Sequence, residues 1–225
     1  MINMVQNQKV SSRMYVYSNL KGKIMNGEIA PGTKLSEQEI SEKLGISRTP
    51  VREAFLQLAQ EYLVGIYPQR GTIVTKIDLQ LVEEGRFVRE HIEKAIVVEA
   101  CKKVNSAHLI ELETNITLQE FSLKKGTFQQ LFELDDEFHQ LFYKICGKQR
   151  TWEMIKRMNV QFDRLRLLRL ASNHDWKNII LQHIALFEAL KTGNPDEAEK
   201  VIVEHLRLVE IEKSTLREQK PEFFV

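Results

Sequence analysis

One aspartate and three histidines are the residues of this sequence whose types and spacing best fit metal chemistry. Asp135 and His139 are four residues apart, so a helix places both side chains on one face. His183 and His205 each stand among apolar residues with helical spacing. Burying a carboxylate and three imidazoles without partners is costly, and a divalent metal removes this cost because it binds neutral imidazoles and an ionised carboxylate together. The pattern alone leaves a second interpretation open, in which the histidines are hydrogen-bonded core residues and Asp135 and His139 form an ordinary pair.

The elements that must position these four residues are helices. From Leu79 onward the apolar residues recur with a period near 3.6, and no strand-like alternation appears. Turn-forming residues interrupt this pattern and predict six helices, at about 79–103, 106–125, 127–146, 149–171, 174–192 and 195–217. The aspartate and the first histidine fall on the third helix, and the other two histidines on the fifth and the sixth. We therefore predict an all-α six-helix bundle over residues 78–217.

The segment from Leu35 to Val74 has a different organisation, which is typical of a helix-turn-helix followed by a hairpin. Ser36 can cap a first helix, and Gly45 suits the left-handed backbone of a sharp turn. Ser47 or Thr49 can cap a second helix. The inward face of that helix is expected to consist of Val51, Ala54, Phe55 and Leu58.

Cationic and hydroxyl side chains gather at the start of the second helix and at the tip of the hairpin. A helix that carries Arg48, Thr49 and Arg52 in its first turns suits the major groove, where base edges and phosphates are both within reach. The hairpin strands are expected at about 63–67 and 72–76, and they would form a wing that reaches the DNA backbone or the minor groove. Its expected contact residues are Gln69, Arg70, Gly71 and Thr72. Residues 10–77 are thus predicted to form a winged helix-turn-helix, and the whole chain to be mainly α.

Charge is distributed unevenly along the 225 residues, although the net charge is only +1. Residues 1–77 hold ten Lys/Arg and six Asp/Glu, a balance of +4, and the remainder holds 22 and 25, a balance of −3. A DNA-contacting part joined to a part that avoids DNA explains this difference, and so does chance. Cys101 and Cys146 are expected to be reduced core thiols. No secretory signal and no run of about 18 apolar residues is evident, so we expect a cytoplasmic protein without a membrane partner.

The front part of the chain resembles the winged-helix domain of the GntR family of bacterial transcription regulators. Tyr62 departs from the family pattern, which usually has glycine before Leu-Val, and is expected to alter the helix end locally. Gln38 replaces an arginine that contacts DNA in some members. The residues that carry the resemblance are Pro31-Gly32, Leu35-Ser36-Glu37, Leu44-Gly45, Ser47-Arg48-Thr49-Pro50-Val51-Arg52-Glu53-Ala54, Leu63-Val64 and Arg70-Gly71.

The helical part resembles the FCD (FadR C-terminal-like) ligand-sensing domain, in its VanR-like branch. The motif Asp-x-x-Phe-His is present as Asp135 to His139, and the two later histidines of the family match His183 and His205. The turn Gly-Asn-Pro-x-x-Ala stands before the last helix, at 193–198. The resemblance implies that these four residues bind a divalent metal, zinc or nickel, with manganese or iron as alternatives. Lys148 departs from the asparagine that is usual after the third helix.

The same resemblance suggests where an effector would bind. Family members often carry an arginine that points into the pocket at the position of Arg89, where it could hold a carboxylate by a bidentate pair. An ordinary ion pair with Glu93, four residues on, is the other interpretation. Arg164 and Arg166 are further candidates for the pocket. The remaining histidines, His91, His108 and His174, are expected to be surface or structural residues.

These features predict a homodimeric transcription regulator that binds a pseudo-palindromic double-stranded DNA operator. A small organic acid at the metal of the helical domain would modulate this binding. The alternatives are a metal-dependent hydrolase or lyase, in which the same four ligands activate water, and a DNA-binding regulator with a purely structural metal. We expect that the chain is not an enzyme, because no general acid or base is evident beside the ligands and the DNA-binding part would be unexplained.

Overall fold

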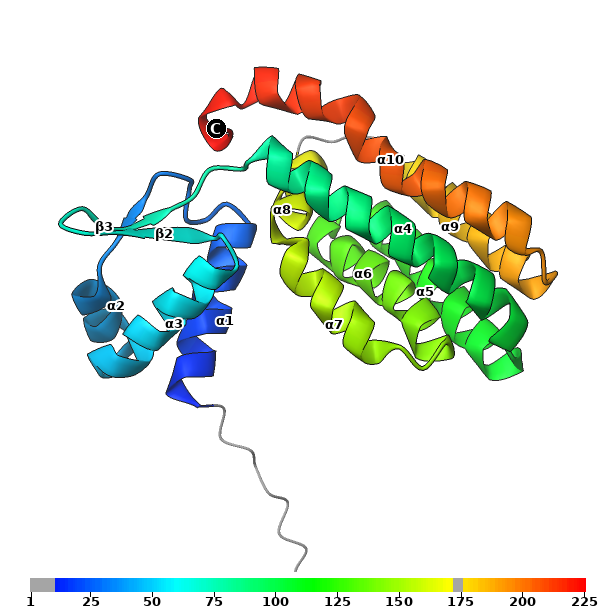
Figure 1. Cartoon of the computed structure of the whole chain (residues 1–225), viewed down its shortest axis with the longest axis horizontal. Helices are drawn as coiled ribbons and strands as arrows, with labels where there is room; N and C mark the ends of the chain where they lie inside the picture. Colours follow the sequence, from blue (N-terminus) through cyan, green and yellow to red (C-terminus); the bar gives the residue numbers. More distant parts are fainter. Residues whose placement is uncertain (1–10, 172–175) are drawn as a thin grey trace, which may run out of the picture. The chain divides into compact units, whose positions relative to one another are not determined.

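The computed structural model describes residues 11–171 and 176–225 (Figure 1). The chain divides into two compact units, 1–76 and 77–225, each with its own core. The division lies one residue from the boundary expected from the sequence. Helices dominate both units, as the sequence pattern predicts, and a small sheet belongs to the first unit.

The first unit is a three-helix winged fold. The strands form an antiparallel sheet in the order β1-β3-β2, in which Val64 pairs with Val74 and Leu35 with Thr72. The short first strand was not expected, because two residues are too few to show an alternating pattern. The elements are α1 (Ser12–Met25), β1 (Lys34–Leu35), α2 (Glu37–Leu44), α3 (Arg48–Gln60), β2 (Val64–Tyr67) and β3 (Gly71–Val74).

The helix-turn-helix ends follow the expected turn chemistry with one exception. The Ser36 hydroxyl accepts a hydrogen bond from the backbone N–H of Glu39, and Gly45 takes the left-handed conformation with φ 63°. Ser47 is the N-cap of α3, but its side chain makes no capping hydrogen bond, and Thr49 lies inside the helix. The expected inward face of α3 is confirmed, because Val51, Ala54, Phe55 and Leu58 are all buried.

Tyr62 occupies a backbone conformation that favours glycine. Its φ is 57°, in the left-handed region, directly after α3 ends. The N–H of Leu63 still reaches the carbonyl of Leu58, so the chain turns into β2 as a glycine would allow. The departure from the family pattern is therefore local, as expected from the sequence.

The second unit is an all-helical bundle closed by the end of the chain. Ile77 forms a parallel bridge with Phe224, so the two ends of this unit lie side by side. Asp78 and Asn194 cap α4 and α10 by accepting hydrogen bonds from backbone N–H groups. The elements are α4 (Leu79–Lys103), α5 (Ser106–Lys125), α6 (Phe128–Ile145), α7 (Gln149–Met158), α8 (Val160–Ala171), α9 (Trp176–Lys191), α10 (Pro195–Gln219) and the 3-10 turn η1 (Pro221–Phe223).

The fourth expected helix, 149–171, is two helices, so the described part of the bundle has seven helices rather than six. The break is at Asn159, a weak helix former whose buried side chain lies against α4. A Cβ at Gly85 of α4 would be 2.7 Å from the Asn159 Oδ1 atom. This close approach depends on a contact between distant helices, which periodicity along one helix does not reveal.

The bundle core surrounds the predicted metal ligands. Aromatic residues of α6 and aliphatic residues of α9 and α10 are buried together, for example Phe138, Phe142, Leu186 and Ile202. Both cysteines are free thiols, of which Cys146 is buried. Among the described residues, no helix combines the length and the apolar character needed to cross a bilayer.

Candidate functional site

The four predicted metal ligands converge inside the bundle. Asp135 and His139 come from α6, His183 from α9 and His205 from α10. One ligand atom of each lies within 4.8 Å of the ligand atoms of all the others, and all four side chains are buried. Three helices thus bring residues that are up to 70 positions apart in the sequence into one cluster.

The distances within the cluster match those between ligands of one ion. The Nε2 atoms of His139 and His205 are 3.1 Å apart. Asp135 lies 3.9 Å from His139 Nε2 through Oδ2 and 3.6 Å from His183 Nε2 through Oδ1. Donor atoms that bind one ion at about 2.0–2.2 Å are about 3–4 Å from each other.

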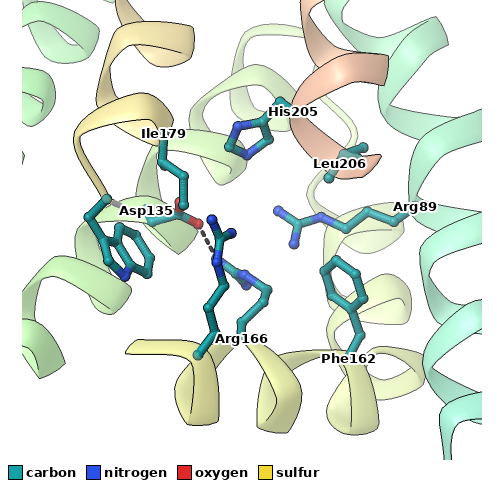
Figure 2. A pocket seen from close by; sticks show the side chains of 9 residues that line it. Arg89, Asp135, Phe162, Arg166, Ile179, His205 and Leu206 are labelled. Carbon is teal, nitrogen blue, oxygen red and sulfur yellow. Dashed lines mark hydrogen bonds and ion pairs between the residues drawn. The ribbon is translucent and has the colours of Figure 1, made fainter. Parts of the chain in front are cut away.

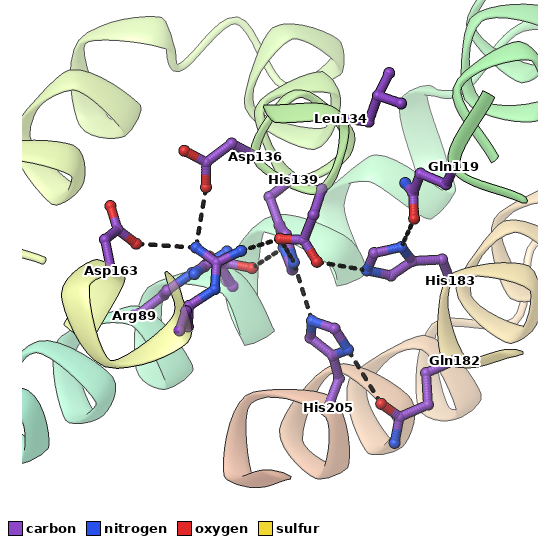
Figure 3. Close-up of polar contacts among 12 residues, drawn as sticks. Arg89, Gln119, Leu134, Asp136, His139, Asp163, Gln182, His183 and His205 are labelled. Atoms are coloured by element: carbon purple, nitrogen blue, oxygen red, sulfur yellow. Dashed lines mark hydrogen bonds and ion pairs between the residues drawn. The ribbon is translucent and has the colours of Figure 1, made fainter. Parts of the chain in front are cut away.

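Each imidazole is oriented by a hydrogen bond at its other nitrogen (Figure 3). His139 Nδ1 lies 2.6 Å from Glu93 Oε2, His183 Nδ1 lies 2.8 Å from Gln119 Oε1, and His205 Nδ1 lies 3.1 Å from Gln182 Oε1. These oxygens are acceptors, so each Nδ1 carries a proton and each Nε2 faces the cluster. Such partners fix the tautomer and the ring orientation of histidines that bind metals.

The orientation of His183 is set by a chain of hydrogen bonds that begins at a backbone carbonyl. The carbonyl of Leu134 can only accept, and it receives a hydrogen bond from Asn115 Nδ2 at 3.0 Å. Asn115 Oδ1 then accepts from Gln119 Nε2 at 2.7 Å, which leaves Gln119 Oε1 for His183 Nδ1. The chain has only one consistent direction, so His183 Nδ1 carries a proton, and in the neutral ring Nε2 presents the lone pair.

The donor set fits a divalent metal on two further observations. The Nε2 atom of His183 is buried and has no hydrogen-bond partner among the described residues. Burial lowers the pKa of His183 to about 3 and holds the pKa of His205 well below its usual value, so both rings are neutral ligands. One aspartate and three imidazoles are a donor set suited to zinc or nickel.

Asp135 is held ionised by the charged groups around it. Burial alone would raise the pKa of Asp135, but the guanidinium of Arg166, which donates to its Oδ2, lowers the pKa together with smaller effects of His139, His183 and Arg89. Arg166 also donates to Asp136 and Asp163, at 3.0 and 2.9 Å. Arg166 was a secondary candidate from the sequence, and in the structure it binds the carboxylate of a candidate metal ligand directly.

A small cavity opens beside the ligands (Figure 2). It has a volume of about 20 Å³, which is room for about one water molecule. The guanidinium of Arg89 points into it. Among the residues that the structure describes, the Nη2 atom of Arg89 and the Nε1 atom of Trp176 are buried donors without hydrogen-bond partners. The lining residues are Arg89, Asp135, Phe162, Arg166, Arg169, Trp176, Ile179, His205 and Leu206.

The ion pair expected between Arg89 and Glu93 is present, and it leaves part of the Arg89 guanidinium facing the cavity. Its Nε atom donates to Glu93, and its Nη2 atom remains available to the cavity. Burial alone would raise the pKa of Glu93, but the nearby Arg89 and His139 lower it to about 2. Glu93 therefore connects the candidate effector residue to a metal ligand.

Sequence reasoning missed the residues that orient the histidines. Gln119 and Asn115 are polar residues four apart on the buried face of α5, and that pairing is the signal that could have revealed them. Gln182 precedes His183 on α9 and gives no comparable signal. Arg164 is buried but does not line the cavity, and burial lowers its pKa to about 10.

The other histidines stand outside the cluster. His91 is exposed on α4, and His108 is partly buried near the start of α5. His174 lies outside the described residues.

The expected DNA-contacting residues are mostly exposed. Arg48, Thr49 and Arg52 are exposed on the first turns of α3, and Gln69 and Arg70 at the turn between β2 and β3. Gly71 is partly exposed and has φ 87°.

Thr72 is placed differently from the other wing residues. Its side chain is only 6% exposed, because it pairs with Leu35 and Ile66 inside the sheet. We therefore correct the expected contact set and leave the Thr72 side chain out of it.

Family models match both units of the chain. The model described as "Bacterial regulatory proteins, gntR family" matches residues 13–74, and the model described as "FCD domain" matches residues 86–208. The two matches agree with the two compact units, and they cover the α3 arginines and all four candidate metal ligands.

The chain is similar to known proteins over nearly its full length. The chain is 34% identical over 209 residues to the HTH-type transcriptional repressor RspR of Escherichia coli, with 93% of this chain and 92% of the relative covered. It is 32% identical over 221 residues to an uncharacterized HTH-type transcriptional regulator of Streptomyces ambofaciens, with 98% and 93% covered. The solved structure of E. coli McbR/YncC matches with a TM-score of 0.77 at 23% identity, covering 93% of this chain and 99% of that one, and shows the fold. The chain therefore belongs to the GntR family of DNA-binding transcription regulators and carries an FCD domain.

Proposed function

We propose that this regulator binds its operator as a homodimer and that a small organic acid, bound at a metal in the FCD domain, modulates this binding. The observation that carries the proposal is the set of three imidazoles whose Nε2 atoms face one carboxylate and one another. The family membership supports the DNA-binding role, and the cluster of Asp135 and the three histidines is a candidate binding site for the metal and the effector.

Asp135, His139, His183 and His205 would hold the metal, with zinc or nickel favoured by three nitrogen donors and manganese or iron as alternatives. When bound, the ion would supply Lewis-acid positions that accept a carboxylate oxygen. Four protein ligands leave two positions at an octahedral ion. The cavity beside Asp135 and His205 lies on the side from which such a ligand would enter.

Arg89 would bind the acid directly. Its Nη2 atom is a buried donor without a partner that lines the same cavity as Asp135 and His205. An unpaired buried donor costs free energy, and an anionic oxygen would remove that cost. Trp176 Nε1 offers a second unpartnered donor for the same ligand.

The small size of the cavity suggests how ligand binding would change the conformation of the helical bundle. About 20 Å³ is too little for an organic acid, so binding requires side chains or helices to move. A ligand shifts an equilibrium only when it favours one conformation over another. Movement of α8 or α10 away from the cavity would provide that difference, and it would affect DNA binding through the relative placement of two winged helices.

The DNA-reading surface supports a two-fold operator. Arg48 and Arg52 would make base and phosphate contacts, with further contacts from Thr49 and the wing residues Gln69, Arg70 and Gly71. One recognition helix contacts too few bases for useful specificity, so two copies on a pseudo-palindrome are needed.

A thermal-shift screen of the full chain tests the effector proposal. Di- and tricarboxylates, sugar acids and amino acids are each added to the metal-loaded and to the chelator-treated protein. We expect at least one acid to raise the melting temperature only when metal is present and to change operator affinity in a gel shift. Arg89→Gln should keep the metal and lose the response to the acid.

Two other outcomes would replace this proposal. If no acid stabilises the metal-loaded protein, the metal is structural and the effector proposal fails. If the purified protein shows chelator-sensitive hydrolase or lyase turnover, the metalloenzyme interpretation is favoured, although the relatives reported above are named as transcriptional regulators.

A further inference from the structure

The outer face of the wing carries two glycines, and a long side chain of another residue lies over each of them. Tyr67 pairs with Gly71, and strand alternation places Gly65 on the same face as Tyr67. Gly65 pairs with Ile73, which also pairs with Lys34 of β1. The buried residues of the opposite face are Leu35, Val64, Thr72 and Val74. The face that carries the glycines is therefore turned away from the core of the first unit.

The ring of Tyr67 lies directly over Gly65. A Cβ atom at Gly65 would be 2.6 Å from both the Cε2 and the Oη atom of the Tyr67 ring, which is closer than such atoms can approach. Gly65 is not among the glycines with a positive φ, so its backbone conformation does not require glycine. A glycine inside a strand often marks such a close approach of another group. We conclude that Gly65 leaves room for the ring of Tyr67.

The ring of Tyr67 in turn contacts the side chain of Arg70. The guanidinium carbon lies 5.8 Å from the ring centroid, within the range of a cation–π interaction. The backbone N–H of Arg70 donates to the carbonyls of Tyr67 and Pro68, at 3.2 and 2.7 Å. The turn thus restrains the backbone of Arg70, and the ring restrains its exposed side chain.

The second glycine lies under Lys34. A Cβ atom at Gly71 would be 3.1 Å from the Cε atom and 4.0 Å from the Nζ atom of Lys34. The stem of this exposed lysine therefore passes over Gly71 and brings its ammonium group next to the tip of the wing. Lys34 belongs to β1, the strand that the sequence pattern did not reveal, so its charge could not be assigned to the wing from sequence.

We propose that Tyr67 is a positioning residue that holds Arg70 for insertion into the DNA minor groove, and that Lys34 binds a phosphate beside that groove. The inference rests on the proposed function, because it requires the wing to contact DNA. A restrained side chain loses less freedom on binding than a mobile one, and this difference increases affinity.

The inference also specifies which DNA the wing prefers. The minor groove of A·T-rich DNA is narrow and strongly negative, and both properties favour an inserted arginine. G·C pairs place the guanine amino group in the same groove, where it meets the guanidinium as a second donor. Base pairs beside each half-site that are A·T-rich should therefore bind more tightly than G·C-rich ones.

Gel-shift titrations with two versions of one operator test the role of the ring. The operator is a fragment that the wild-type protein selects from random duplexes, with the base pairs beside each half-site made A·T-rich or G·C-rich. Tyr67→Leu should weaken binding about two- to fivefold and reduce the preference for A·T, because the cation–π contact is lost. Tyr67→Phe keeps the ring and should behave as the wild type does. Tyr15→Leu, at another exposed tyrosine of the first unit, is the matched control and should change nothing.

Gly65→Ala displaces the ring without changing it. Its Cβ atom occupies the place of the Tyr67 ring, so this variant should lose the same affinity and the same preference as Tyr67→Leu. The two changes act on one contact, and the double variant should bind no more weakly than Tyr67→Leu alone. Losses that add in the double variant would show that Gly65 acts independently of the ring, and would overturn this step.

The salt dependence of binding tests the role of Lys34. Each phosphate contact contributes about 0.9 to the slope of log affinity against log salt concentration. Lys34→Gln should reduce the slope by about this amount and leave the preference for A·T unchanged. Lys102→Gln, at an exposed lysine of α4, should leave the slope unchanged. An unchanged slope in Lys34→Gln would overturn the phosphate contact.

Arg70→Ala separates this inference from the proposed function. It should weaken binding about tenfold and remove the preference for A·T. If Arg70→Ala binds as the wild type does, the proposed contact of the wing with DNA fails and the inference fails with it. If Arg70→Ala binds weakly but Tyr67→Leu matches the wild type, or Tyr67→Phe is as weak as Tyr67→Leu, the positioning role of the ring is overturned and the wing contact remains. Circular dichroism and thermal unfolding should be the same for all these variants, which substitute exposed or partly exposed residues.

Discussion

The Nε2 atoms of His139 and His205 lie 3.1 Å apart at the centre of the FCD domain. Each ring has its Nδ1 atom hydrogen-bonded to an acceptor oxygen, of Glu93 and of Gln182. Two nitrogen lone pairs at this distance repel each other unless a proton or a cation lies between them. A single proton would leave His183 Nε2 without a partner, whereas a divalent metal engages all three rings and Asp135 at once.

Metal removal should therefore destabilise the protein. An ion that binds only the folded state at a hundredfold excess over its dissociation constant contributes about 2.7 kcal/mol, or about 5–10 °C in melting temperature for a domain of this size. We expect a chelator to lower the melting temperature by this amount. His183→Ala should bind no metal by elemental analysis and should not respond to chelator.

His91→Ala is the control for that experiment, because it removes an exposed histidine of α4 outside the cluster. It should bind metal and respond to chelator as the wild type does. Wild-type protein that contains no metal after loading, and whose melting temperature ignores chelator, would contradict the metal site.

Loss of the Gln119 side chain should weaken metal binding although Gln119 is not itself a ligand. Gln119→Leu removes the acceptor for His183 Nδ1, and such partners are worth about 10–100-fold in metal affinity. Gln119→Glu keeps an acceptor oxygen and should retain most of the affinity, as measured by competition with a chelating dye. Ser122→Ala, at a buried hydroxyl of the same helix without a partner, should have no effect. Equal affinities for Gln119→Leu and wild type would remove Gln119 from the site.

The candidate ligands could be predicted from the sequence, whereas the residues that orient their imidazoles could not, for a physical reason. Asp135 and His139 can be recognised in the sequence because both lie on one apolar helix face, where an unpaired polar group is costly. Gln119 and Gln182 support histidines 64 and 23 positions away, and only the packing of α5 and α10 against α9 brings these partners together. The buried polar pair of Asn115 and Gln119 is visible in the sequence, but no local pattern shows which histidine it contacts.

The distinction between local turn chemistry and contacts with distant elements also explains where the observed fold differs from the predicted one. The ends of α2, α4 and α10 were predictable because local turn chemistry at Ser36, Asp78 and Asn194 determines them. The break at Asn159 depends on α4, which lies against it at Gly85. Thr72 was misplaced for a similar reason, since pairing with β1 buries it.

Removing the Arg52 side chain should weaken operator binding at least tenfold. Arg52 is exposed on the second turn of α3, and a good contact from an arginine to a base is worth about 1–3 kcal/mol. The measurement is a gel-shift titration on a fragment that the wild-type protein selects from random duplexes. Lys102→Ala, which removes an exposed positive charge from α4, should bind as the wild type does. Unchanged affinity for Arg52→Ala would place this face of α3 outside the groove.

The FCD domain should lose stability as the solution becomes acidic, in part through Glu90. The hydrogen bond from Arg207 outweighs burial and lowers the pKa of Glu90, and Arg86 adds to this effect. A carboxyl with a lower pKa in the folded state stabilises the protein above its unfolded pKa of about 4.3, and that contribution is lost as pH falls through the folded value.

Urea unfolding at pH 7 and at pH 3.5 measures this effect. Both tryptophans of the chain, Trp152 and Trp176, belong to the second unit, so their fluorescence reports this domain alone. Glu90→Gln should reduce the difference between the two midpoints, and Glu113→Gln, at an exposed position of α5, should not. An unchanged difference in Glu90→Gln would show that the contact between α4 and α10 does not contribute.

The winged helix should become more stable when Tyr62 is replaced by glycine. Tyr62 has φ 57°, and a side chain in this conformation costs about 1–2 kcal/mol. Glycine removes this strain but gives the unfolded chain more freedom, at about 0.5–1 kcal/mol, so the net gain should be about 0.5–1 kcal/mol. Tyr62→Ala keeps the Cβ atom and the strain, and it should bring no gain. Hydrogen exchange of the α3 amides measures the difference, because about 1 kcal/mol slows exchange through unfolding of this unit about fivefold. Equal protection in Tyr62→Gly and Tyr62→Ala would show that the ring of Tyr62, rather than its backbone conformation, determines the stability of this turn.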